Sequence, residues 1–114
     1  MMQPLPLDPY IVDVLMRDLA GHDRAPSAFL VYLWLWRQSA GEGRPRVAAS
    51  LQTIATRTGL SKSAVQAAVA HLKRRRLVTA ERRHPTDAPV YEVHMPWRRQ
   101  ASPSSAVSSA PPVK

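Results

Sequence analysis

Residues 51–78 have the sequence LQTIATRTGLSKSAVQAAVAHLKRRRLV, which is the pattern of two helices joined by a tight turn. Ser50 is a suitable N-cap for the first helix, because its hydroxyl can accept a hydrogen bond from a free backbone N–H of the first turn. Gly59 suits the end of that helix, because glycine adopts the left-handed backbone conformation at little cost. Ser61 then caps a second helix, which we expect to span Lys62–Arg75.

The second helix has one apolar face and one small, basic face. Its apolar residues recur at the spacing i, i+3, i+4 and i+7, which places them on one stripe toward the core: Val65, Ala68, Val69 and Leu72. The outward side carries Ser63, Gln66, Ala67, Ala70 and Arg74, with Lys73 at its edge. A helix with such a face can approach a polyanion closely.

The spacing of these signals resembles the winged helix-turn-helix DNA-binding family, of the bacterial transcriptional regulator or replication-initiator type. The likeness extends over roughly residues 26 to 95 and rests on Ile54, Ala55, Gly59, Leu60, Ser61, Val65, Val69, Leu72, Leu77 and Val78. It implies a mainly α fold with a small β-hairpin wing, and a three-helix core preceded here by an extra N-terminal helix. The alternative is a helical hairpin inside another small domain.

The N-terminal part is expected to hold a loose arm over residues 1–8 and then an amphipathic helix from Pro9 to a stop at Gly21. The apolar residues of that helix are Ile11, Val12, Leu15, Met16 and Leu19. Two roles are open for it: packing on the core, or forming a dimer contact. We therefore divide the chain into residues 1–25, the domain at 26–96 and a disordered Ala/Ser/Pro-rich tail at 97–114.

The first helix of the winged domain is predicted over Ser27–Ala40, with Pro26 in its first turn. It is apolar on nearly every side, so we expect other helices to cover it; the residues concerned are Phe29, Leu30, Leu33, Trp34 and Trp36. Gly41, Gly43 and Pro45 should break this helix before a short strand at Arg46–Ala49.

The segment after the second helix of the pair has the pattern of a hairpin. Leu77–Arg83 and Val90–Met95 are strand-like, and HPTDAP at residues 84–89 forms the turn between them. The family resemblance implies that the basic tip, Arg82, Arg83 and His84, meets the minor groove or a phosphate. For Trp97, Arg98 and Arg99 three readings are open: contact with the domain, extension of the basic surface, or no role.

Charge is concentrated in the half of the chain that contains the paired helices. Residues 44–99 contain twelve Lys or Arg residues and three Asp or Glu residues, whereas residues 1–43 contain three Lys or Arg residues and five Asp or Glu residues. The formal net charge of the whole chain is +8. This asymmetry favours a nucleic-acid partner. Cysteine is absent, no apolar run reaches the ~20 residues that a membrane helix needs, and the four histidines lie in four separate segments. We therefore expect the protein to lack enzymatic activity and to bind no cofactor, metal ion, small-molecule ligand or membrane. We expect it to be cytoplasmic and associated with the nucleoid.

The expected function is sequence-specific binding of double-stranded DNA in transcriptional regulation, with a homodimer as a candidate assembly. Lys62 and Ser63 would meet phosphates, and Gln66 would read a base edge, because an amide can bond an adenine bidentately. The alternatives are a plasmid or phage replication-initiator module and a winged helix that docks a protein. The predicted DNA-binding residues are Ser61, Lys62, Ser63, Gln66, Ala67, Ala70, Lys73, Arg74, Arg82, Arg83 and His84.

Overall fold

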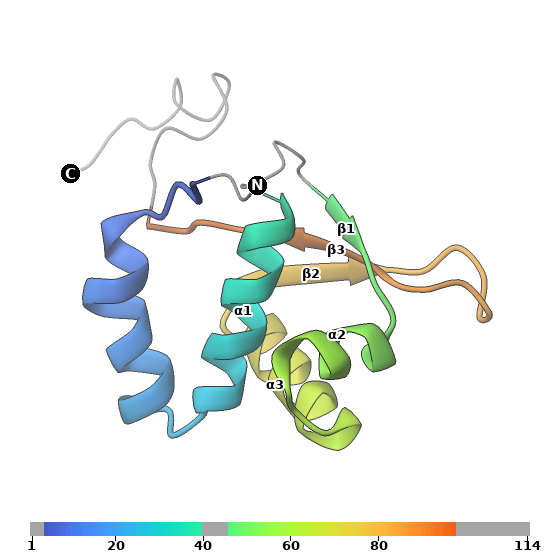
Figure 1. The fold of residues 1–114 in the computed structure, drawn as a ribbon, viewed down its shortest axis with the longest axis horizontal. Helices are drawn as coiled ribbons and strands as arrows, with labels where there is room; N and C mark the ends of the chain where they lie inside the picture. The colour runs from blue at the N-terminus through green and yellow to red at the C-terminus, as the bar shows by residue number, and fades with distance from the viewer. Residues whose placement is uncertain (1–3, 40–45, 98–114) are drawn as a thin grey trace.

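The computed structural model describes residues 4–39 and 46–97. Its elements in chain order are η1 (Ile11–Leu15), η2 (Arg17–His22), α1 (Pro26–Ser39), β1 (Arg46–Ala48), α2 (Leu51–Thr58), α3 (Lys62–Arg74), β2 (Val78–Glu81) and β3 (Val90–Val93). Figure 1 shows the N-terminal helix and the loop between β2 and β3 at opposite ends of the longest axis. The fold is mainly helical with a hairpin wing, which confirms the predicted winged helix-turn-helix architecture.

Helix α2 begins and ends next to its predicted caps, and α3 begins at the predicted Lys62 and ends at Arg74, one residue before the predicted end. The Ser50 side chain accepts from the Thr53 N–H at 3.0 Å, and the Ser61 hydroxyl accepts from the Ala64 N–H at 3.1 Å. Gly59 closes α2 in the left-handed conformation, with φ of 81°. Each cap satisfies a backbone group that the helix itself leaves free, so the turn between the two helices is fixed by local chemistry.

The C-terminal end of α3 is closed by an arginine in a position that usually favours glycine. Arg76 has φ of 60°, its N–H bonds the Lys73 carbonyl at 3.0 Å, and the Leu77 N–H bonds the Leu72 carbonyl at 2.9 Å. These two bonds form the paired closure that satisfies the last carbonyls of a helix. They also turn the chain directly into β2.

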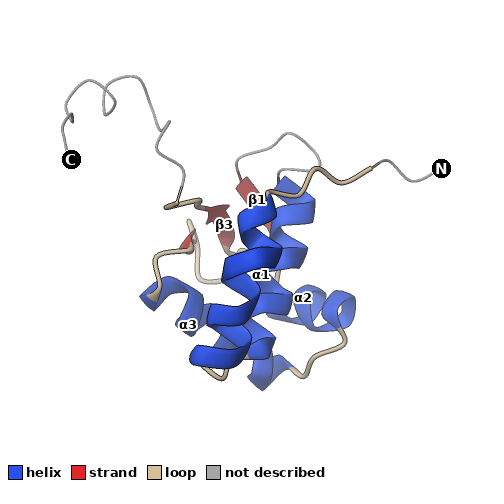
Figure 2. Cartoon of the chain, turned by 90° about the vertical axis from the view of Figure 1, so that its left-hand side faces the viewer, coloured by secondary structure: helices blue, strands red, loops and turns tan. Residues whose placement is uncertain are grey.

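Helix α1 is the centre of the fold and contacts α2, α3, η2, β1 and β3. Figure 2 shows the helices packed together with the strands at one edge of the bundle. The buried side chains of α1 come from most of its circumference, as its composition predicts: Ala28, Phe29, Val31, Tyr32, Leu35, Trp36 and Ser39. Leu30 is an exception, because its side chain is exposed rather than covered.

The N-terminal helix is continuous from Pro9 to His22, and its hydrogen bonds reach back five residues rather than four. The N–H of Asp23, for example, bonds the Asp18 carbonyl at 2.8 Å. The helix passes through Gly21, where we predicted a stop, and the chain turns at Arg24, whose φ is 54°.

Only part of the predicted apolar face of this helix is buried. Ile11, Leu15 and Leu19 join the hydrophobic core, which supports the packing role that the sequence left open. Val12 and Met16 are instead exposed. The helix therefore contributes to the core and also presents an uncovered apolar strip.

The sheet has the order β1-β3-β2, with both pairs antiparallel. Its strands are shorter than predicted, so the wing, defined as β2, β3 and residues 82–89 between them, has a longer loop than the sequence indicates. The Tyr32 hydroxyl donates to the His94 carbonyl at 2.8 Å, and the His94 N–H bonds the Leu77 carbonyl at 2.8 Å. These bonds fasten the base of the wing to α1 and to the end of α3.

The two ends of the described chain are held to the domain rather than loose. Trp36 donates its indole N–H to the Pro6 carbonyl at 2.8 Å, and Trp97 donates to the Asp8 carboxylate at 3.0 Å. Trp97 also stacks on Tyr10, with ring centroids 4.6 Å apart. Of the three readings open for Trp97, contact with the domain is the one observed. The helix break at residues 41–45, Arg98, Arg99 and the tail lie outside the described residues.

Asp23, which follows the N-terminal helix, links that helix to α3. We call Asp23 and its partners His22, His71 and Arg75 the acidic clamp. Asp23 accepts from His71 Nε2 at 2.8 Å and from Arg75 Nε at 3.0 Å, and its other oxygen lies 2.8 Å from His22 Nδ1. Hydrogen bonds from His22 and His71 lower the pKa of Asp23 below its ordinary value, aided by Arg75 and opposed by burial. His22 is mostly exposed, so His71 and Arg75 are the partners that tie the two helices together.

The lowered pKa of Asp23 predicts a pH-dependent loss of stability. A carboxylate with a folded-state pKa below its unfolded value stabilises the protein above about pH 4, and the stabilisation disappears as pH falls through the folded pKa. We expect Asp23→Ala to lower the free energy of unfolding by about 1 to 3 kcal/mol near neutral pH, because it leaves part-buried donors unpaired. As pH falls below about 4 and through the lowered folded-state pKa of Asp23, the difference from wild type should shrink. Urea unfolding followed by circular dichroism measures both values.

The control for this prediction is Asp13→Ala, which removes an exposed carboxylate from the same helix. It should leave stability unchanged at both pH values. A difference between wild type and Asp23→Ala that is as large in acid as at neutral pH would contradict the role of the ionised clamp.

Candidate nucleic-acid interface

The exposed side of α3 carries the residues that the sequence placed there. Ser63, Gln66, Ala67, Ala70, Lys73 and Arg74 are all exposed, and the opposite stripe of Val65, Ala68, Val69 and Leu72 is buried. The stripe packs on α1 and α2. Burial of one side therefore fixes which side chains of α3 face outward.

The start of α3 presents a hydroxyl pair and an ammonium group. Ser61 and Ser63 have their hydroxyl oxygens 3.3 Å apart, and Lys62 beside them is exposed. Ser61 Oγ already accepts from the backbone as the N-cap. Donors that lie at the positive end of a helix are suited to an anionic group.

Helix α3 stands between two hollows. On one flank a hollow of about 370 Å³ separates it from the start of α1 and is lined by Ala64, Ala67, His71 and Arg74, among others. On the other flank a groove of about 380 Å³ separates it from the wing. The small side chains of its exposed face and the hollows on both flanks make α3 the element best placed to enter a groove of a polymer.

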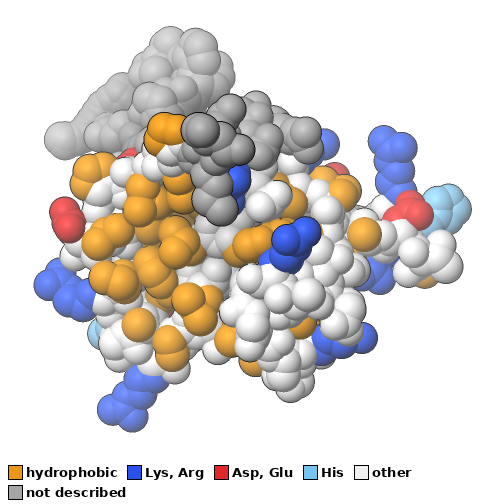
Figure 3. All heavy atoms as spheres, in the orientation of Figure 1, with side chains coloured by type: hydrophobic (Ala, Val, Ile, Leu, Met, Phe, Trp, Pro, Cys, Tyr) orange, Lys and Arg blue, Asp and Glu red, His pale blue; other side chains and the backbone are white. Residues whose placement is uncertain are grey.

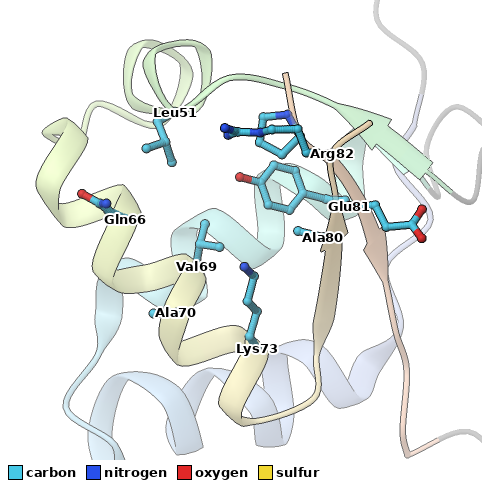
Figure 4. A pocket seen from close by; sticks show the side chains of 10 residues that line it. Leu51, Gln66, Val69, Ala70, Lys73, Ala80, Glu81 and Arg82 are labelled. Atoms are coloured by element: carbon cyan, nitrogen blue, oxygen red, sulfur yellow. The ribbon is translucent and has the colours of Figure 1, made fainter. Parts of the chain in front are cut away.

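The groove between α3 and the wing, here called the wing groove, is drawn in Figure 4. Its α3 side consists of Gln66, Val69, Ala70 and Lys73. Its wing side consists of Ala80, Glu81, Arg82, Pro89 and Tyr91, and Leu51 of α2 completes it. Lys73 extends along the groove, and the Arg82 guanidinium lies across from α3 (Figure 4). The groove thus unites residues from both predicted DNA-binding segments.

The wing tip brings the predicted basic residues Arg82, Arg83 and His84 together in exposed positions. Arg82 donates to the Pro85 carbonyl at 3.3 Å, and the Asp87 N–H bonds the His84 carbonyl at 3.0 Å. These two bonds give the loop a defined turn. The guanidinium of Arg82 is oriented by its bond but remains exposed.

Two features of this surface were not predicted from the sequence. Arg75 continues the basic run of α3, but it pairs with Asp23 at 3.0 Å and with Asp18 at 3.7 Å, so it serves the acidic clamp. Tyr91 lines the wing groove, whereas the sequence placed it only within the predicted strand Val90–Met95. No local pattern could have revealed either role, because both depend on contacts between distant segments.

Two other kinds of feature are absent from the part of the chain that the structure describes. Among residues 4–39 and 46–97, no three His, Asp or Glu side chains are grouped so that they could hold a metal ion. Within the same ranges, no helix has both the length and the apolar character needed to cross a bilayer.

Comparison with known proteins agrees with this geometry. Residues 25–78 match the family described as a helix-turn-helix domain, a range that begins just before α1 and ends at the first residue of β2. No curated protein and no solved structure matches the chain. The matched range contains α1, the capped pair α2 and α3, and the exposed face of α3. Over residues 25–78 this chain is therefore similar to the helix-turn-helix domain family.

Proposed function

We propose that this chain binds double-stranded DNA sequence-specifically, with α3 in the major groove and the wing against the flanking backbone. The observation that carries the proposal is the exposed face of α3, which is small, contains one amide and ends in cations. Helix-turn-helix domains place their second helix in the major groove, so the family match supports the same use of α3. The excess of basic residues over residues 44–99 supplies attraction to phosphates.

Each exposed residue of α3 has a proposed role. Lys62 and Ser63 contact phosphates at the start of the helix, together with the Ser61 hydroxyl. Gln66 reads a base edge, because its amide can donate to and accept from an adenine. Ala67 and Ala70 let the helix backbone approach the bases, and Lys73 and Arg74 meet the backbone farther along.

The biological role that we propose is transcriptional regulation in the cytoplasm. A replication-initiator module would use the same surface on origin DNA, so the role depends on where the bound sites lie. Selection of bound fragments from genomic DNA separates the two: sites in promoters support regulation, and sites confined to a replication origin contradict it.

The proposal predicts a strong salt dependence to which the wing contributes. Affinity for duplex DNA should fall steeply as salt rises, because cationic contacts release condensed counterions. The double variant Arg82→Ala/Arg83→Ala should reduce the magnitude of the salt slope by roughly one unit per lost phosphate contact while the fold stays intact. Fluorescence anisotropy over a salt series measures the slope. If the unaltered chain binds no duplex even at low salt, the protein-docking alternative replaces this proposal.

Gln66 is predicted to set sequence preference. Gln66→Ala should weaken the binding free energy for a preferred DNA site by about 1 to 3 kcal/mol, because the base contact is lost. Its affinity for unrelated duplexes should stay nearly unchanged. Gln38→Ala, which removes the same amide from α1, is the matched control. Equal losses for Gln66→Ala on both kinds of duplex would make Gln66 a backbone contact.

We also propose that the chain forms a homodimer through the uncovered strip of the N-terminal helix. Val12 and Met16, at i and i+4, are 43% and 40% exposed, and Leu30 of α1 is 43% exposed. Figure 3 shows hydrophobic side chains gathered over these two helices, at the end of the molecule away from the wing. Such a patch suits a protein contact, and a two-fold dimer would present two copies of α3 to a pair of half-sites.

The dimer is tested by introducing charge into the strip without touching the core. Val12→Glu/Met16→Glu should give a monomer with an unchanged circular dichroism spectrum, because these side chains are exposed already. Sedimentation velocity reports the assembly, and Arg17→Glu, an exposed change on the same helix, serves as the control. A wild-type chain that is monomeric at every concentration would contradict the dimer.

A further inference from the structure

Tyr91 places an unpaired hydroxyl at the wing groove. Its side chain is only 2% exposed, and it lines the groove. None of the hydrogen bonds of the described residues involves its hydroxyl, whereas the buried Tyr32 hydroxyl has a carbonyl acceptor. Within those same residues every fully buried side-chain polar atom has a partner. The Tyr91 oxygen therefore retains contact with the open space of the groove, where a ligand can reach it.

The Tyr91 hydroxyl is available as a hydrogen-bond donor. Burial raises the pKa of Tyr91 above its ordinary value of 10.0, and the nearby Arg82 opposes this rise only in part. The phenol therefore keeps its proton at neutral pH. A buried aromatic ring with a free O–H at the edge of a groove is a rigid donor, because the ring position is already fixed by packing.

The charges around this donor favour an anion. Lys73 enters the groove from α3 and Arg82 from the wing. Glu81 also borders the groove, but it is next to Ala80, which pairs with Tyr91 across the two strands. Because neighbouring strand residues point to opposite faces, Glu81 is directed away from the face that carries Ala80 and Tyr91. Figure 4 shows its carboxylate pointing out of the groove.

Resting on the proposed function, we infer that the wing groove seats a phosphate of the DNA backbone, with the Tyr91 hydroxyl donating to a non-bridging oxygen and Lys73 and Arg82 flanking it. A duplex whose major groove holds α3 must carry its backbone past the flanks of that helix. The wing groove runs along one such flank, beside Gln66, Ala70 and Lys73. Tyr91 is thereby a positioning contact, which fixes the register of α3 on the duplex without reading sequence.

The test removes the hydroxyl and keeps the ring. Tyr91→Phe should lower affinity for duplex DNA about tenfold, the effect of one lost hydrogen bond to a charged group. The loss should be the same on unrelated sequences, because a phosphate carries no sequence information. The salt slope should stay unchanged, because a neutral donor releases no counterion, whereas Lys73→Ala should reduce its magnitude by roughly one unit. Anisotropy with two unrelated duplexes over a salt series gives all these values.

Tyr10→Phe is the matched control, because Tyr10 stacks on Trp97 and does not line the wing groove. It should bind as wild type does. The melting temperature of Tyr91→Phe should also equal that of wild type, and a fall of several degrees would assign the hydroxyl to the fold and overturn the inference.

The remaining outcomes separate this inference from the function on which it rests. If wild type binds duplex DNA and Tyr91→Phe binds it equally well, the contact between the Tyr91 hydroxyl and a phosphate is contradicted. The proposal that the chain binds DNA is then unaffected. A loss confined to one sequence would make Tyr91 a base contact, which also contradicts the phosphate contact. A wild-type chain that binds no duplex contradicts both proposals.

Discussion

Burial of one stripe of α3 against α1 and α2 is the constraint on which the rest of the structure depends. Each fully buried Val or Leu contributes roughly 1.5 to 3 kcal/mol relative to exposure, so a rotation that exposed Val65, Val69 and Leu72 would be strongly unfavourable. At about 100° per residue, fixing this stripe also fixes the opposite side. The outward display of Gln66 and its neighbours is thus a consequence of core packing.

The rest of the domain holds α3 at both ends and supports the wing beside it. Ser61 caps its start, the turn at Arg76 closes its end, and Asp23 binds His71 and Arg75 on its last turns. Tyr32 ties the base of the wing to α1. A helix fixed at both ends presents its side chains to a ligand with little ordering cost, which is the physical basis of a preorganised interface.

The elements that could be predicted from the sequence are those set by local chemistry. Serine caps, the left-handed glycine and the apolar period of α3 involve residues within a few positions of one another, and the structure confirms each. The exposure of the predicted DNA-binding residues of α3 follows from burial of the same apolar stripe on the opposite side of the helix. The predicted ends of the wing strands were less accurate, because nothing in the sequence fixes how far the pairing of β2 and β3 continues.

The remaining features depend on contacts between distant segments. Asp23 and His71 are 48 positions apart, and Asp8 and Trp97 are 89 apart. Tyr91 becomes a groove residue only when α3 and the wing meet. The exposure of Val12 and Met16 likewise follows from how the N-terminal helix lies on the core, together with its wider hydrogen bonding. No periodicity in a single segment carries such information.

We propose that the exposed face of α3 and the wing groove together form the surface that meets duplex DNA. The most direct measurement is the change in backbone amide chemical shifts when a duplex is added to the isotope-labelled chain at low salt. We predict that the largest changes fall on Ser63, Gln66 and Ala70 and on the wing around Arg82, with little change at Val12 and Met16. Changes centred on the N-terminal helix, with α3 and the wing unaffected, would show that duplex DNA binds elsewhere on the chain.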